Sequence, residues 1–236
     1  MTEHTHKQFD AEMEAIRSGV LTMGGLVETQ LARAIQMLQE EGDHAAVLDA
    51  VGADEQAINR MQVEIDQQCS QIIAKRQPAA IDLRMVLTVT KIVNDLERVG
   101  DETKKIARRA AETAQYQRLQ QVRHFDVARA AVRARESLQL ALDAFARLDV
   151  ASATEVIDLD SEIDAAFTAI TRQLVSYMME DPRTISAALE LLFVAKSIER
   201  VGDHAKNIAE AVVQVVRGID VRHQTAEQIR AEVADE

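Results

Sequence analysis

The 236-residue sequence has one cysteine, two prolines, eight glycines, no tryptophan and only 3% aromatic residues. A single cysteine, Cys69, cannot form an intrachain disulfide, which favours a reducing compartment. The scarcity of proline and glycine leaves long stretches without helix breakers, and the rest of the composition is rich in helix-forming residues. The sequence therefore predicts an all-α protein.

The sequence also lacks a membrane segment and an excess of positive charge. Its longest apolar run, residues 191–195, is far shorter than the roughly 20 residues that cross a bilayer. The first residues have neither the basic start nor the apolar segment of a secretory signal. Thirty-nine acidic and 27 basic side chains give a net charge of -12, which disfavours nucleic acid and anionic membranes and favours cations or basic protein patches as partners. We expect a cytoplasmic protein that neither inserts into a membrane nor binds nucleic acid.

One five-residue segment, Glu-Arg-Val-Gly-Asp, occurs twice. It spans residues 97–101 and returns 102 residues later at 199–203, and Ile-Ala follows each copy at 106 and 208. A fixed long-range period indicates an internally repeated architecture. The chain is therefore expected to consist of two similar halves.

Apolar residues spaced three and four apart predict three long helices in each half. Breaks at Gly42, Pro78 and Pro182 separate the helices, and a polar segment at 116–123 joins the halves. The alternating spacing is typical of a left-handed helical bundle. We predict helices over 9–41, 44–76, 79–113, 125–148, 151–179 and 184–217. The domains would be two tandem three-helix bundles, 8–115 and 122–218, and a charged C-terminal tail, 219–236, that is helical with frayed ends.

The repeated segment places two carboxylates side by side, because residues four apart lie on one face of a helix. In the second half these are Glu199 and Asp203. Asp160 and Asp164 lie about as far before the Pro182 turn as that pair lies after it. In an antiparallel helix pair, the four carboxylates would therefore meet at one level.

The first half repeats this arrangement with one substitution. Glu97 and Asp101 are level with Glu55 and Asn59, so an amide replaces one carboxylate. Helical geometry turns Glu97 and Asp101 roughly 130° to 170° away from the apolar seam of their helix, which predicts that the carboxylates face outward.

These carboxylates could hold metal ions, because a bound cation would reverse their mutual repulsion. All-oxygen ligation suits Mg, Mn, Ca or ferric iron, and Zn is a further candidate. The alternative is an ordinary solvated face, on which the carboxylates pair with basic side chains close in sequence: Arg98, Arg200, Lys104 and Lys206.

Gly100 and Gly202 occupy the same place in the two copies, where a glycine inside a helix costs about 1 kcal/mol relative to alanine. Close approach of a neighbouring helix would offset that cost.

The sequence has no P-loop, no nucleotide-binding glycine pattern and no Ser/His/Asp set, so no catalytic machinery is expected.

The doubled segment, with Ala-Lys-Arg-Gln-Pro-Ala-Ala-Ile-Asp-Leu-Arg at 74–84 and Tyr-Met-Met-Glu-Asp-Pro-Arg at 177–183, resembles the PhoU family of bacterial phosphate-uptake regulators. The resemblance covers residues 6–223. It implies two symmetry-related three-helix bundles, multinuclear metal clusters held by paired acidic motifs, and a homodimer. The motifs match at Glu97/Asp101, Glu199/Asp203 and Asp160/Asp164, whereas Glu55/Asn59 departs from the pattern.

The resemblance also implies a role as a cytoplasmic negative regulator of the phosphate regulon. Such an adaptor couples the ATPase of the phosphate ABC transporter to a sensor histidine kinase and is not an enzyme. The alternative is a metal-dependent hydrolase or oxidase. That class needs an open coordination position in a pocket, which carboxylates on a convex bundle face would not supply.

Overall fold

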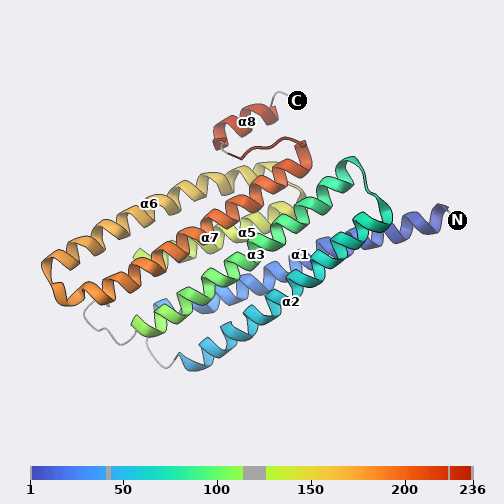
Figure 1. Cartoon of the computed structure of the whole chain (residues 1–236). Coiled ribbons are helices and arrows are strands. Elements are labelled where there is room, and N and C mark those ends of the chain that lie inside the picture. The colour runs from blue at the N-terminus through green and yellow to red at the C-terminus, as the bar shows by residue number, and fades with distance from the viewer. Residues whose placement is uncertain (1, 41–43, 114–125, 223, 235–236) are drawn as a thin grey trace.

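The computed structural model describes residues 2–40, 44–113, 126–222 and 224–234, and every regular element in them is helical. The long helices form two groups of three that lie side by side (Figure 1). The first group is α1 (Thr2–Gln39), α2 (Ala45–Arg76) and α3 (Ala80–Thr113), and the second is α5 (Ala128–Arg147), α6 (Val150–Glu180) and α7 (Ile185–Arg217). A 3-10 turn, η3 (Pro182–Thr184), precedes α7, and a short helix, α8 (Ala226–Ala234), ends the chain. The predicted all-α fold with two three-helix bundles is confirmed.

The core follows the predicted apolar spacing. Ile92, Leu96 and Val99 on α3 are fully buried, as are Val194 and Val201 on α7. Burying an aliphatic side chain of this size contributes about 1.5–3 kcal/mol, so these two seams supply a large part of the driving force for packing.

The two proline turns reverse the chain in different ways. Helix α2 ends at Arg76. The left-handed backbone of its C-cap residue, Gln77 (φ 50°), closes the last turn, and Pro78 cannot extend the helix. In the second half, the carboxylate of Asp181 accepts the backbone N–H of Arg183 and so caps the turn that begins at Pro182. Both turns make the flanking helices antiparallel neighbours.

The bundles pack against each other mainly through α3 and α7, which run antiparallel through the middle of the molecule (Figure 1). A second contact joins α1 to α5. A Cβ atom at Gly24 of α1 would lie 2.7 Å from Leu142 Cδ2 on α5, so any larger residue there would require the Leu142 side chain to shift. The two halves therefore form one continuous core.

The ends of the chain differ from the predicted pattern. Helix α1 begins at Thr2 and not at residue 9, and α8 is anchored because Ile229 is buried and Arg230 pairs with Asp158 of α6. The expected break at Gly42 and the joining segment 116–123 lie outside the described residues. None of the described helices is both long and apolar enough to cross a membrane.

Candidate metal centre

A close contact between α6 and α7 positions the acidic residues of the second half. A Cβ atom at Gly202 would lie 2.9 Å from Ile163 Cδ1, so the absence of a side chain at Gly202 lets the helices approach closely. Ile163 lies between Asp160 and Asp164, and Gly202 directly precedes Asp203. The contact therefore brings the carboxylates of the two helices to the same level.

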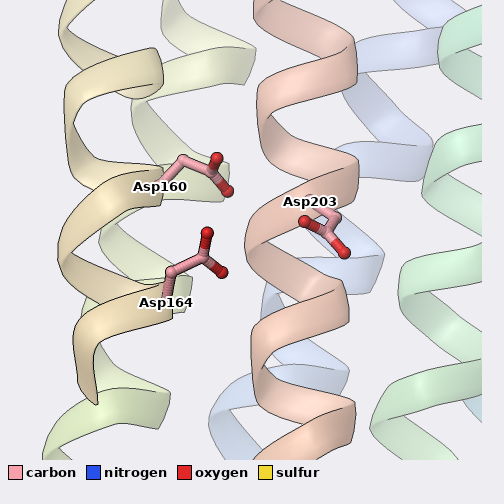
Figure 2. A group of neighbouring side chains, drawn as sticks. All are labelled: Asp160, Asp164 and Asp203. Carbon is pink, nitrogen blue, oxygen red and sulfur yellow. The ribbon is translucent and has the colours of Figure 1, made fainter. Parts of the chain in front are cut away.

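Asp160, Asp164 and Asp203 form a compact cluster (Figure 2). Each offers a carboxylate oxygen, and these atoms lie within 4.8 Å of one another. Asp160 is buried, whereas Asp164 and Asp203 are exposed. Among the described residues, neither Asp164 nor Asp203 has a hydrogen-bond or ion-pair partner. Three convergent carboxylate oxygens with one open side fit a hard cation such as Mn²⁺, Mg²⁺ or ferric iron.

The electrostatics of this cluster favour a cation. Burial, followed by the negative charge of Glu199, Asp160 and Asp164, raises the pKa of Asp203 to about 6. Although part of Asp203 reaches solvent, the surrounding protein still makes desolvation the largest cause. Burial and the neighbouring carboxylates also raise the pKa of Asp164. Glu199 therefore lies close enough to Asp164 and Asp203 for its charge to raise both pKa values.

Two lysines occupy part of the cluster. Lys206 Nζ lies 2.7 Å from Asp160 Oδ2, and Lys196 Nζ lies 2.5 Å from each carboxylate oxygen of Glu199. The alternative of pairing with Lys206 is thus observed in part. Lys196 was not among the predicted partners, although it precedes Glu199 by three residues, a spacing at which helical side chains meet.

The first half has the same construction. A Cβ atom at Gly100 would lie 3.2 Å from Ile58 Cδ1, and Ile58 directly precedes Asn59. Burial and then the charge of Asp101 raise the pKa of Glu97. Both glycines therefore permit close packing beside an acidic motif, as their repeated positions predicted.

The carboxylate oxygens of the acidic residues in the first half lie farther apart than those of the Asp160, Asp164 and Asp203 cluster. No three of its described acidic groups come within the 4.8 Å that joins the second-half cluster. Lys104 Nζ lies 3.0 Å from Glu55 Oε2, and Arg98 Nε lies 3.6 Å from Glu97 Oε2. Asn59 Oδ1 is buried without a partner among the described residues and is available as a neutral oxygen ligand.

The expectation that all the acidic pairs face outward on a convex surface is wrong. The Asp160 side chain is 6% exposed, and those of Glu199 and Glu97 are 13% and 19% exposed. These three side chains are shielded at the close α2–α3 and α6–α7 contacts, whereas Asp164 and Asp203 remain exposed. Asp101 and Asp203 also border a groove of about 630 Å³ between α3 and α7. The sequence-based expectation that these acidic residues border no pocket, which disfavoured an enzyme, therefore does not hold for Asp101 and Asp203.

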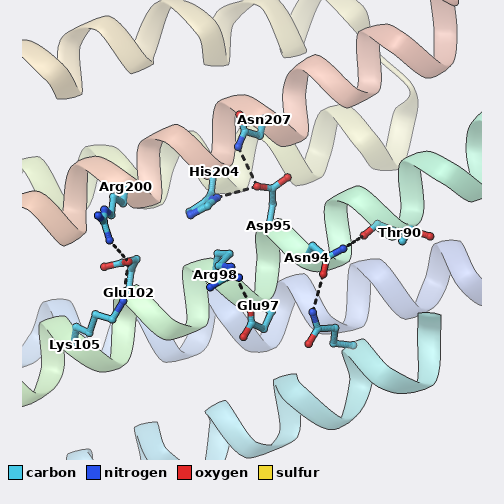
Figure 3. Close-up of polar contacts among 11 residues, drawn as sticks. Thr90, Asn94, Asp95, Glu97, Arg98, Glu102, Lys105, Arg200, His204 and Asn207 are labelled. Atoms are coloured by element: carbon cyan, nitrogen blue, oxygen red, sulfur yellow. Dashed lines mark hydrogen bonds and ion pairs between the residues drawn. The ribbon is translucent and has the colours of Figure 1, made fainter. Parts of the chain in front are cut away.

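A polar network that the helical spacing did not predict joins α3 to α7 (Figure 3). Glu102 is 5% exposed and accepts hydrogen bonds from Lys105 and Arg200. Burial alone would raise the pKa of Glu102, but hydrogen bonds from Lys105, Ser197 and Arg200 lower it. Arg200 therefore pairs with Glu102 and not with a predicted metal ligand.

A second part of this network involves a histidine. His204 Nδ1 lies 2.8 Å from Asp95 Oδ1, which also accepts from the Asn207 amide. Glu102 and His204 occupy equivalent positions in the two repeats, so an alignment of the repeats could have identified both as residues facing the other half.

Comparisons with known proteins agree with this architecture. The PhoU domain model matches residues 20–110 and 127–212. A Pseudomonas putida protein named phosphate-specific transport system accessory protein PhoU homolog is 45% identical over 99% of this chain and 90% of its own. The Escherichia coli phosphate-specific transport system accessory protein PhoU is 42% identical over 97% of this chain and 93% of its own. The crystal structure of PhoU from Pseudomonas aeruginosa has a TM-score of 0.83 and 42% identity, and the match covers 89% of this chain and all of that one.

Proposed function

The chain belongs to the PhoU family, and from this we propose that it is an accessory protein of a phosphate transport system that regulates phosphate uptake. The support is the near full-length likeness to relatives that carry this description. The proposed mode of action is that of a cytoplasmic, homodimeric adaptor. It would couple the ATPase of the phosphate ABC transporter to a sensor histidine kinase and so hold the phosphate regulon in its repressed state.

We further propose that the adaptor binds divalent or ferric ions at two sites. The observation that carries this proposal is the convergence of Asp160, Asp164 and Asp203, with the raised pKa of Asp203. Glu199 completes the second site, and the first site consists of four residues on α2 and α3: Glu55, Asn59, Glu97 and Asp101. A bound cation would cancel the repulsion among these carboxylates and hold α6 against α7 in a fixed shape for partners to recognise.

The adaptor proposal is tested by neutralising both motifs without changing side-chain size. The variant carries Glu97→Gln, Asp101→Asn, Glu199→Gln and Asp203→Asn. We expect it to keep its helical circular dichroism spectrum, because none of these side chains belongs to the apolar core. We also expect it to lose repression of phosphate-responsive genes in cells grown on ample phosphate.

A matched control removes four exposed carboxylates outside both sites, by substituting glutamine at Glu64, Glu155, Glu180 and Glu227. This control should retain repression. Full repression by a metal-free motif variant would mean that the carboxylates are dispensable for the adaptor role.

The groove beside Asp101 and Asp203 is the one observation that favours a second candidate, a metal-dependent hydrolase or oxidase. A turnover screen with phosphate esters in the presence of Mn²⁺ or iron distinguishes the two. Activity that Glu199→Ala abolishes would support the enzyme.

A further inference from the structure

Each half contains one lysine that bridges the two helices of its acidic site. Lys206 on α7 reaches Asp160 on α6 at 2.7 Å, and Lys104 on α3 reaches Glu55 on α2 at 3.0 Å. Each lysine follows the second carboxylate of its motif by three residues, and each contacts the first member of the facing pair. The bond therefore recurs in both copies of the repeat.

In both bonds the carboxylate is less exposed to solvent than the lysine. The Asp160 and Glu55 side chains are 6% and 16% exposed, whereas Lys206 and Lys104 are 33% and 52% exposed. The carboxylate end of each bond is thus held inside the helix pair, and the lysine chain lies along an open edge. A long flexible side chain with its stem at the surface can swing into solvent without disturbing the core.

From this repeated geometry we propose that Lys206 and Lys104 are internal counter-cations that hold the two sites in their metal-free form and are displaced when a metal binds. The inference rests on the proposed metal sites. Without a metal, Asp160 is a mostly buried carboxylate beside those of Asp164 and Asp203, and a buried charge without a partner is strongly destabilising. The ammonium group of Lys206 offsets that cost.

A metal ion and the lysine compete for the same carboxylate. Asp160 Oδ2 accepts the ammonium group, and the Asp160 carboxylate also supplies one of the oxygens that lie within 4.8 Å of those of Asp164 and Asp203. Two cations on one carboxylate repel each other, so the lysine has to leave. Because the ion has to displace the lysine, the site binds metal less tightly than the same carboxylates would without the lysine. Ions whose affinity for the carboxylates is low are therefore excluded from the site.

The test measures Mn²⁺ affinity by isothermal titration calorimetry on chelator-treated, full-length protein. To isolate the second site, all proteins carry Glu97→Gln and Asp101→Asn. Lys206→Met should tighten Mn²⁺ binding about fivefold, the upper end of the range for loss of an ion pair with one partly exposed partner. It should also lower the melting temperature of the metal-free protein more than that of the Mn²⁺-loaded protein.

Three further variants separate the bond from the charge. Lys206→Arg keeps the charge and should stay within about threefold of the parent. Lys105→Met removes an equal charge from a lysine that bonds Glu102, which is not a proposed ligand, and should leave Mn²⁺ affinity unchanged. Lys206→Gln repeats the experiment if the methionine variant does not fold.

A second measurement follows the lysines directly. Brief acetylation read by mass spectrometry should label Lys206 and Lys104 of the unsubstituted protein faster when Mn²⁺ is present, while Lys105 labels at the same rate. Equal or weaker Mn²⁺ binding by both Lys206→Met and Lys206→Gln, or unchanged labelling in protein that binds Mn²⁺, would overturn the displacement and leave the metal sites intact. If an Asp160→Asn, Asp164→Asn variant binds Mn²⁺ as well as its parent, the proposed metal site itself fails.

Discussion

Replacing Gly202 by leucine tests the packing that brings the second acidic cluster together. The first added atom alone would lie 2.9 Å from Ile163 Cδ1 and 3.3 Å from Ile163 Cγ2. Ile163 is 2% exposed and cannot move into solvent. A leucine side chain therefore has to push α6 away from α7 at the level of the carboxylates.

The magnitude follows from two opposing contributions. Leucine is better than glycine inside a helix by about 0.8 kcal/mol, whereas overpacking a well-filled core typically costs about 1–3 kcal/mol. We expect a net destabilisation of about 0.2–2 kcal/mol. Gly52 is the matched control, because it also lies inside a helix but a Cβ atom there meets nothing within 4 Å. Gly52→Leu should stabilise the protein by under about 1 kcal/mol.

The assay is urea denaturation followed by circular dichroism. With an m-value of about 2–3 kcal/mol/M, Gly202→Leu should lower the midpoint by up to about 1 M, whereas Gly52→Leu should raise it by up to about 0.5 M. Gly202→Leu should also weaken Mn²⁺ binding, because it separates Asp203 from Asp160 and Asp164. A midpoint at or above that of the original protein would show that Gly202 does not limit the approach of α6.

Three other results are expected. Neutralising Glu199 and Asp203 should remove more bound metal, measured by elemental analysis, than neutralising Glu97 and Asp101, because the second site has four carboxylates and the first has three; equal losses would contradict this ranking. The pKa of Asp203 is raised from 3.8 to about 6, so the folded state binds this proton more tightly than the unfolded state, and the metal-free protein should lose stability as the pH rises from about 4 to about 6. Asp203→Asn should remove that slope from thermal melts, and an unchanged slope would assign it to another group. Glu102→Gln should lower the free energy of unfolding by about 1–3 kcal/mol, because Lys105 and Arg200 lose a charged acceptor, whereas the exposed Glu112→Gln should have little effect in the same urea titration.

Most of the fold could be predicted from the sequence, because the spacing of apolar residues along a helix and the positions of proline turns are local properties of the chain. The three- and four-residue spacing of Ile92, Leu96 and Val99 identifies the buried face of α3 without knowledge of its neighbours. Counting residues from Pro182 also placed Asp160 and Asp164 level with Asp203, because the rise per residue of a helix is constant. The level of the acidic residues is thus a consequence of chain length alone.

Only the tertiary structure decided what surrounds those residues. The pairing of α3 with α7 buries Glu102, orients Arg200 toward it and brings Asp95 to His204, although these residues are about 100 positions apart. The rotation of each helix about its axis relative to its neighbour decides which cation reaches a carboxylate. That rotation is set by packing across all three helices of a bundle and by the contact between bundles. For this reason the sequence identified Lys206 and Arg200 equally as partners, and only the packing directed Lys206 to Asp160 and Arg200 to the other half.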